Sequence, residues 1–188
     1  MNIDDFWTVI ETARTDAASA SGDPSQAFAS ALVERLAATW KQTILEYQQC
    51  FDQLHGAIYR RDMWAAGHLI GGGCSDDAFM DFRAGLIAQG RQWYERAATA
   101  PDVLAQHPDV IAAAVEGTDE ALFNETVNYA ASHAYERING DDCTFLRRLR
   151  PVLRTPHRPG TGRNGRELRF QRRLGNAGPF PRTGPPLP

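Results

Sequence analysis

Apolar residues recur every three or four positions along the first 140 residues, which is the spacing of one face of an α-helix. Runs of alternating apolar and polar residues, which strands favour, stay at about five residues or fewer. The sequence therefore predicts an all-α fold, a compact bundle of about five main helices. Their stripes are Ile3, Phe6, Trp7 and Ile10; Phe28, Ala31, Leu32 and Leu36; Ile44, Gln48, Phe51, His55 and Ile58; Phe79, Phe82, Leu86, Gly90 and Trp93; and Leu122, Phe123, Val127, Ala130, Ala134 and Ile138.

Capping residues set the expected ends of these helices. The fourth helix is expected to run without interruption from about Asp76 to Ala98, and the Asn139–Gly140 pair is a typical helix stop. Shorter apolar helices are expected at "MWAAGHLI" and "VIAAAVEG". The expected N-caps are Asn2, Asp23 followed by Pro24, Thr39 in a capping box with Gln42, Ser75, and Thr118.

Charge divides the chain into two parts near residue 140. Residues 1–140 hold 9 Lys and Arg against 20 Asp and Glu, whereas residues 141–188 hold 11 Arg against 3 acids. Eight of the eleven prolines lie between Pro151 and Pro188. We therefore expect a helical domain over 1–140 and an Arg/Pro/Gly-rich, disordered tail over 141–188. Nucleic-acid binding is an alternative through this tail alone, since an acidic body repels polyanions.

The sequence gives only a few indications of cellular location and of cofactors. No apolar run approaches the roughly 18 residues of a membrane span, and "MNIDDFW" lacks the basic start of a signal peptide, so we expect a cytoplasmic protein with no membrane partner. Cys50, Cys74 and Cys143 share no CxxC spacing, which favours free thiols over a zinc site. We expect no metal and no cofactor.

The segment "LIGGGCSDDAF" raises the question of an anion site. Glycines before a helix can expose backbone N–H groups to phosphate. However, Asp76 and Asp77 would repel an anion, and no lysine follows as in a P-loop. We favour a structural N-cap at Ser75, and two adjacent acids are weak evidence for a divalent cation.

Two further groups of residues suggest catalytic chemistry, and for each of them a purely structural role is the alternative. Asp52 and His55 lie three residues apart on a helix, so His55 is a possible general base that Asp52 orients. A hydrogen-bonded core histidine is the commoner arrangement and is favoured. Cys74 near a helix N-terminus is a possible reactive thiol, but a small buried cysteine is the favoured role.

Polar residues and glycine are dense around Trp64, and this density marks the candidate binding surface. A solvated charged surface with salt bridges between helices is the alternative explanation. The surface consists of Tyr59, Arg60, Asp62, Trp64, His68, Ser75, Asp76, Asp77 and Arg83.

Three stretches, "MNIDDFW", "FDQLHGAIYRRDMWAAGHLIGGGCSDDAFMDFRAGLIAQGR" and "AYERING", resemble a bacterial family named domain of unknown function 4240, over about residues 1–140. The resemblance implies no activity, because the family name assigns none. The chain departs from the family pattern at Arg61 and Asp81, where aromatics are usual, and at Gly71 and Gly85. The Arg/Pro/Gly-rich tail also differs from the family pattern. A genuine basic arm and a shifted reading frame would each produce such a tail.

A small helical binding or adaptor module is the favoured function, with an unknown protein or small molecule as partner. The alternatives are an enzyme with a cleft beside the 71–77 glycine turn, and nucleic-acid binding through the tail. A cleft that holds His55 and Asp77 together would favour the enzyme, and their separation would favour the module.

Overall fold

The computed structural model describes residues 1–119, 121–140 and 145, and this part of the chain contains helices and no strand. The predicted all-α class is therefore confirmed. The elements are α1 (Ile3–Ala17), α2 (Pro24–Ala37), α3 (Lys41–Ala57), α4 (Arg61–Ile70), α5 (Asp76–Ala88), α6 (Arg91–Thr99), the 3₁₀ helix η1 (Pro101–Gln106), α7 (Pro108–Glu116) and α8 (Glu125–Asn139).

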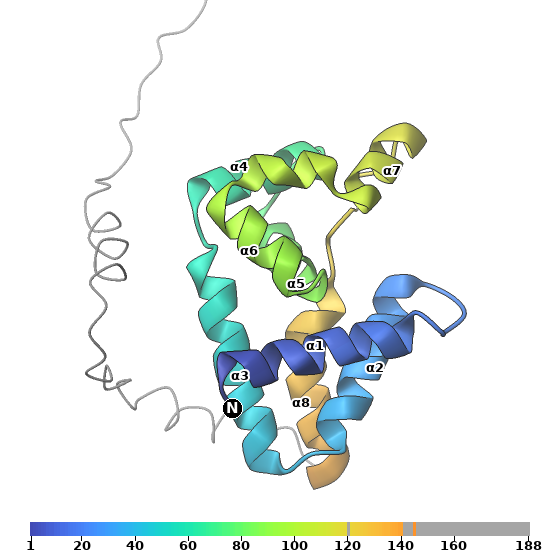
Figure 1. Ribbon diagram of the computed structural model, residues 1–188, viewed down its shortest axis with the longest axis vertical. Coiled ribbons are helices and arrows are strands. Elements are labelled where there is room, and N and C mark those ends of the chain that lie inside the picture. Colours follow the sequence, from blue (N-terminus) through green and yellow to red (C-terminus); the bar gives the residue numbers. More distant parts are fainter. Residues whose placement is uncertain (120, 141–144, 146–188) are drawn as a thin grey trace, which may run out of the picture. The chain divides into compact units, whose positions relative to one another are not determined.

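The helices form two neighbouring groups around one core. α2 packs against α1 and α8, and α5 packs against α8 (Figure 1). α4, α6 and α7 each contact η1, so this short helix holds the second group together. The apolar stripes supply the core, whose largest fully enclosed side chains include Phe6, Ile10, Leu32, Leu36, Ile44, Tyr47, Phe79, Phe82, Leu86 and Tyr135.

Several predicted helix ends are confirmed. Asn2 and Asp5 form a reciprocal capping box at the start of α1, and Asp23 caps α2 with Pro24 at the first helical position. Gly140 adopts the left-handed conformation at φ 70° and ends α8. Local capping chemistry therefore fixes these boundaries as the sequence predicts.

The prediction of about five main helices is too low, since the described residues form eight α-helices and one 3₁₀ helix. The expected continuous helix 76–98 is wrong, because Gly90 at φ +90° separates α5 from α6. A Cβ on Gly90 would lie 2.3 Å from the Glu11 Oε1 atom. That same carboxylate accepts a hydrogen bond from the Arg91 N–H at 3.1 Å, so α1 supplies the cap of α6.

Two predicted caps are wrong. The Thr39 hydroxyl donates to the Leu36 carbonyl at 2.7 Å, and α3 begins after Trp40 without a side-chain cap. Thr118 does not start the last helix, because α8 begins at Glu125 after Asn124. In both places a hydroxyl stands at capping spacing in the sequence, but the helix begins at a later residue: α3 begins at Lys41 and α8 begins at Glu125.

The segment before α8 crosses α5 at close range. Leu122 adopts φ 67°, an unusual conformation for a non-glycine residue, and its carbonyl oxygen would lie 1.9 Å from a Cβ on Gly85. The Asn124 N–H donates to the Asp81 carbonyl at 3.1 Å. Because Gly85 has no Cβ, the Leu122 backbone can pack directly on α5. α8 begins only after this crossing segment, at Glu125.

The expected tail begins at residue 141, and of its residues the structure describes Phe145. This ring is 4% exposed and lies 5.3 Å from the Tyr135 ring. The disorder predicted for the rest of 141–188 concerns residues outside the described part of the chain. Within the described part, no helix combines the length and the apolar character that crossing a membrane requires.

Candidate functional site

The glycine turn joins the end of α4 to the start of α5. Gly72 and Gly73 have φ values of 58° and 153°, and the Gly73 N–H donates to the His68 carbonyl at 3.0 Å. The Ser75 hydroxyl oxygen accepts from the Ala78 N–H at 3.1 Å, which confirms the predicted N-cap. The exposed Asp76 and Asp77 occupy the first turn of α5, where carboxylates complement the helix dipole. The turn therefore has a complete structural explanation.

The cysteines show no sign of activation. Burial raises the pKa of the Cys74 thiol, whereas a nucleophilic role needs a lowered pKa. Burial also raises the pKa of Cys50, and Cys143 lies outside the described residues. Among the residues that the structure describes, no three His, Cys, Asp or Glu side chains are grouped to hold a metal ion.

His55 uses both ring nitrogens inside the protein. Nε2 lies 3.0 Å from the Met80 carbonyl oxygen, and Nδ1 lies 2.9 Å from Nη1 of Arg83. A carbonyl only accepts and a guanidinium only donates, so Nε2 carries the proton and Nδ1 accepts. Burial lowers the pKa of His55, and the nearby positive charge of Arg83 lowers it further. The imidazole is therefore neutral and engaged, as in a core histidine.

Asp52 does not orient this imidazole. Its carboxylate accepts a hydrogen bond from Gln48 at 2.8 Å, and among the described contacts it has none with His55. Asp77, on the exposed first turn of α5, is likewise absent from the contacts of His55. The proposed acid–base pair and the shared cleft with Asp77 are therefore not assembled in this structure.

Arg83 is buried, with 7% of its surface exposed. Its Nε donates to the Phe79 carbonyl at 3.2 Å, and Nη1 donates to the His55 carbonyl at 2.9 Å. The guanidinium carbon lies 4.8 Å from the ring centroids of both Tyr59 and Phe79. Burial lowers the pKa of Arg83, and the proximity of Tyr59 partly opposes that shift. Arg83 thus ties α5 to the carboxyl end of α3, where free carbonyls and the helix dipole favour a cation.

The structure brings part of the predicted surface together around Phe79. The Trp64 ring stacks on Phe79 at 4.5 Å, and the Tyr59 and Trp64 rings lie 6.1 Å apart. The Trp64 indole N–H also donates to the Cys74 carbonyl at 3.0 Å, which links this aromatic cluster to the glycine turn. Tyr59, Trp64 and Arg83 are therefore neighbours in one cluster around Phe79.

The other predicted surface residues lie outside that cluster. Arg60 forms an ion pair with Asp62 at 3.0 Å and donates to the Ala98 carbonyl at 2.8 Å. This pair anchors the start of α4 to the end of α6. His68, Asp76 and Asp77 are exposed and make no described contact with Arg83.

Sequence analysis did not identify a groove of about 500 Å³ between α4, η1 and α7. The signal was present in the short helices "MWAAGHLI" and "VIAAAVE", which are apolar on more faces than one core contact needs. The groove is lined by Ala66, Leu69 and Ile70 of α4, by Pro101, Asp102, Leu104 and Ala105 of η1, by Val110, Ala113 and Ala114 of α7, and by Thr118.

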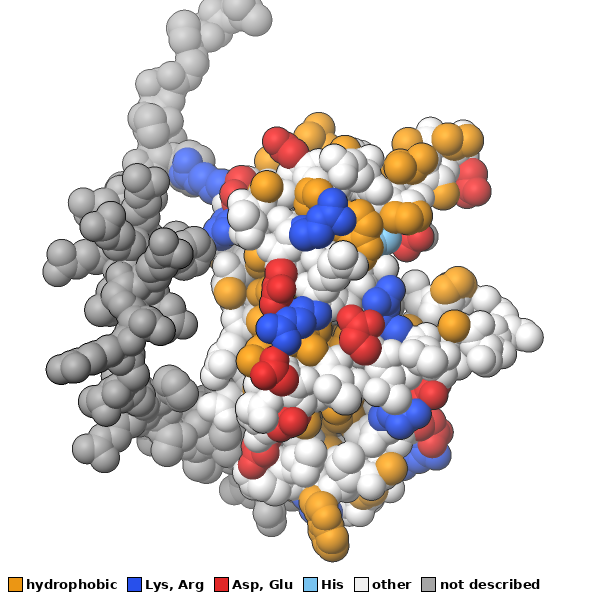
Figure 2. Space-filling model, viewed as in Figure 1, with side chains coloured by type: hydrophobic (Ala, Val, Ile, Leu, Met, Phe, Trp, Pro, Cys, Tyr) orange, Lys and Arg blue, Asp and Glu red, His pale blue; other side chains and the backbone are white. Residues whose placement is uncertain are grey.

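Large apolar side chains stand exposed in this groove and beside it: Leu69 lines the groove, whereas Ile111 and Val115 lie on α7 outside its lining. Leu69 is 82% exposed, and Ile111 and Val115, one turn apart on α7, are 51% and 83% exposed. Figure 2 shows hydrophobic side chains gathered over the end of the molecule that α7 forms, with carboxylates beside them. Residues 100–119 contain no Lys or Arg, and their acids are Asp102, Asp109, Glu116 and Asp119. The wall that η1 and α7 form therefore belongs to an acidic segment without Lys or Arg, and of its acids Asp102 lines the groove itself.

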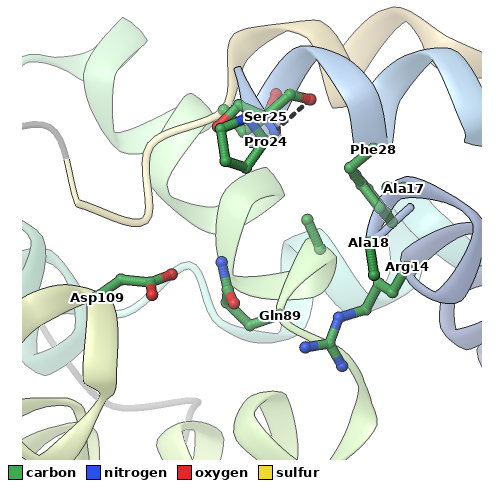
Figure 3. A pocket seen from close by; sticks show the side chains of 10 residues that line it. Arg14, Ala17, Ala18, Pro24, Ser25, Phe28, Gln89 and Asp109 are labelled. Carbon is green, nitrogen blue, oxygen red and sulfur yellow. Dashed lines mark hydrogen bonds between the residues drawn. The ribbon is translucent and has the colours of Figure 1, made fainter. Parts of the chain in front are cut away.

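Two other hollows are more polar. One of about 240 Å³ lies between α1, α2 and the end of α5, with Arg14, Gln89 and Asp109 around it (Figure 3). Another of about 690 Å³ is lined by Asp23, Asp81, Asp119 and Glu125 beside the glycine turn. Burial and the nearby charges of Glu125 and Asp77 raise the pKa of Asp81. Neither hollow is lined by a cysteine or a histidine, so neither pairs a nucleophile with a histidine base.

Comparison with known proteins gives one result. A family model described as "Protein of unknown function (DUF4240)" matches residues 1–137. No curated protein and no solved structure matches the chain significantly. The match includes α1 to α7 and ends within α8, which continues to Asn139.

Proposed function

The chain belongs to the DUF4240 family, whose description assigns no activity, and we propose from the geometry that it is a helical binding module. Its groove between α4, η1 and α7 takes an amphipathic helix of a partner protein, with basic side chains beside the apolar stripe of that helix. The groove supplies apolar contacts, and its acidic wall selects the charge.

The observation that carries the proposal is an apolar groove in which Leu69 is 82% exposed, with the exposed Ile111 and Val115 beside it on α7. Exposed apolar residues are ordinary when scattered singly, but a contiguous patch marks an interaction site. Grooves between helices commonly receive the apolar face of an amphipathic helix through side chains spaced three and four residues apart. The space of about 500 Å³ suits several such side chains.

Charge supports a basic partner. The segment 100–119, which contributes η1 and α7 to the groove, has four carboxylates and no Lys or Arg, and Asp102 is the one of the four that lines the groove itself. Charges at the rim of an interface act mainly on association rate and partner choice, whereas the apolar centre contributes most of the affinity. We therefore expect basic residues on the partner to raise selectivity and to make binding depend on salt.

The hydrogen-bonded state of His55 weighs against the enzyme alternative. Its accepting nitrogen is occupied by Arg83, so it is not available to take a proton from a substrate. The groove itself is lined mainly by Ala, Leu, Ile and Val, which provide no acid, base or nucleophile. A surface for association is what these residues offer.

A designed helical peptide tests the proposal. Its leucines follow the i, i+3, i+4, i+7 pattern, and lysines in one version or glutamates in a second flank them. We expect the lysine peptide to bind the full chain more tightly, as measured by fluorescence anisotropy. Leu69→Asp should weaken binding at least tenfold, because burial of one such side chain is worth about 1.5–3 kcal/mol. Val115→Asp, beside the groove on α7 and not among its lining residues, should weaken binding less.

Trp40→Asp is the matched control. Trp40 is 85% exposed, close to the values for Leu69 and Val115, but it lies between α2 and α3, away from the groove. Its substitution should leave peptide binding unchanged. Equal loss in all three variants would refute the groove, and self-association of the chain without peptide, abolished by Leu69→Asp, would replace the proposed partner by a second copy.

A further inference from the structure

We propose that Arg83 and Tyr59 form a second binding site, one that takes an oxyanion group, carboxylate or phosphate, of a small ligand. This site is separate from the groove, since none of the groove-lining residues takes part in the contacts of Arg83. It therefore stands or falls independently of the proposed function.

The partners of Arg83 are all neutral. Its hydrogen bonds go to the carbonyls of Phe79 and His55 and to the imidazole of His55. Five other described arginines, Arg14, Arg35, Arg60, Arg91 and Arg137, are paired with carboxylates. Within the described part of the chain Arg83, although nine-tenths buried, has no such counter-charge. A buried cation without an anion is costly, and an arriving oxyanion would relieve that cost.

The guanidinium also has donors left over. A guanidinium carries five N–H donors, of which Nε and Nη1 direct three to Phe79 and His55. The two donors of Nη2 have no partner among the described residues. Nη2 is nevertheless absent from the fully enclosed polar atoms that lack a partner, which in the described residues belong to Tyr47, His107 and Tyr135. Nη2 therefore reaches the surface of the protein.

Tyr59 lies at the solvent-exposed edge of the proposed site. Its ring is 59% exposed and lies over the guanidinium at 4.8 Å, and its hydroxyl makes no described hydrogen bond. Arg83 is held in place by three hydrogen bonds and by the Phe79 ring on α5, so little side-chain entropy remains to be lost on binding. A preorganised guanidinium beside an exposed aromatic ring suits a ligand that joins an oxyanion to a planar group.

If Arg83 has only a structural role at the end of α3, it will not bind an added anion. NMR distinguishes this structural role from a binding site. The full chain is titrated with benzoate and, separately, with phenyl phosphate, while the Nε–H signals of arginine are followed. We expect saturable shifts of the Arg83 signal. Saturation by only one of the two compounds identifies the oxyanion and supports the site.

Arg96 is the matched control, because its guanidinium lies 4.5 Å from the Trp93 ring in an exposed setting. Arg83→Met should reduce binding at least tenfold, and Arg96→Met should not. Tyr59→Phe, at an exposed position, removes only the hydroxyl and should weaken binding without unfolding the protein. If Arg83→Met does not fold, the wild-type shifts and Tyr59→Phe still decide the matter.

Three results would overturn the inference. The absence of saturable shifts at millimolar concentrations of either compound would leave Arg83 a structural residue. Equal shifts at Arg83 and Arg96 would indicate an adventitious ion only. Full binding by a folded Arg83→Met variant would place any anion elsewhere.

Discussion

The group formed by α1, α2 and α8 and the group formed by α4, η1 and α7 differ in how they treat their surfaces. In the first, surface charges are paired: Arg35 bonds Asp16 at 2.9 Å, and Arg137 bonds Glu34 at 2.5 Å. In the second, Leu69 and Val115 are more than four-fifths exposed beside a wall without Lys or Arg. The exposed large apolar side chains of the first group, Ile3, Tyr129 and Ile138, are 41%, 45% and 37% exposed, whereas the second group has the composition of a surface that is covered by another molecule.

This contrast shows where stability and recognition reside. Exposed ion pairs contribute about 0–1 kcal/mol each, so the first group owes its stability to enclosed side chains such as Leu32 and Phe6. Exposed Leu69 contributes little to folding, so its apolar character at this place is better explained by contact with a partner. The predictions below test this division, beginning with the largest expected effect.

Truncation of one leucine in each group should have very different effects. Leu32→Ala should lower the free energy of unfolding by about 2–5 kcal/mol, because Leu32 is fully enclosed between helices. Leu69→Ala should change it by less than about 0.5 kcal/mol. Denaturant unfolding of both variants measures this. A large loss of stability in Leu69→Ala would mean that the groove wall is part of the folding core.

Gly85→Ala should also destabilise the protein, by about 1–3 kcal/mol or more, since overpacking forces the backbone to shift. The added Cβ would lie 1.9 Å from the Leu122 carbonyl oxygen. Gly56→Ala is the control, because an added Cβ there meets no atom within 4 Å. Thermal unfolding of the two variants compares them, and an unchanged melting temperature for Gly85→Ala would show that the crossing segment yields easily.

Ser75→Ala should cost about 0.5–2 kcal/mol, the usual range for loss of an N-cap. Ser30→Ala, at an exposed position inside α2, is the control and should be nearly neutral. Chemical denaturation distinguishes them. If both variants match the parent chain, the cap at the glycine turn does not contribute to stability.

The smallest expected effect concerns pH. Burial lowers the folded-state pKa of His55 below its ordinary value of 6.5, so the unfolded chain binds the proton more readily. The stability from His55 is complete above pH 6.5 and is lost as pH falls from there through the lower folded-state pKa. Protonation would also end the acceptor role of Nδ1 toward Arg83. His107, whose pKa burial likewise lowers, should add a loss of the same sign.

Unfolding measured from pH 7.5 downward in about half-unit steps should show this decline. His55→Gln should make it shallower, and substitution of the exposed His68 by Gln should not. A parent chain whose stability does not fall below pH 6.5 would contradict the neutral, partly buried state assigned to His55.

Local signals in the sequence predicted the helical class, the caps at Asn2, Asp23 and Ser75, and most of the core stripes. These features depend on residues within one turn of each other. The break at Gly90 was missed because its cause is Glu11, about eighty residues away in the sequence. The late start of α8 was missed for the same kind of reason, since it depends on the approach of Leu122 to Gly85.

The candidate sites divide in the same way. Tyr59, Trp64 and Arg83 were identified from the density of polar and aromatic residues, and the structure joins them around Phe79. The groove was missed because three separate short segments, α4, η1 and α7, contribute to it, and the sequence does not show that these segments come together. The absence of a carboxylate partner for Arg83 could not be predicted from the sequence either, because acids lie close to Arg83 along the chain but not in space.

Backbone NMR of the full chain with the lysine-flanked peptide tests the central claim most directly. The account predicts that chemical-shift changes concentrate on Leu69, Ile70, Val110, Ala113 and Ala114, and that they fade as salt rises. The exposed surfaces of α1, α2 and α8 should remain unchanged. Shifts spread evenly over both groups, or centred on the ion-paired surface of α1 and α2, would contradict the assignment of recognition to the groove.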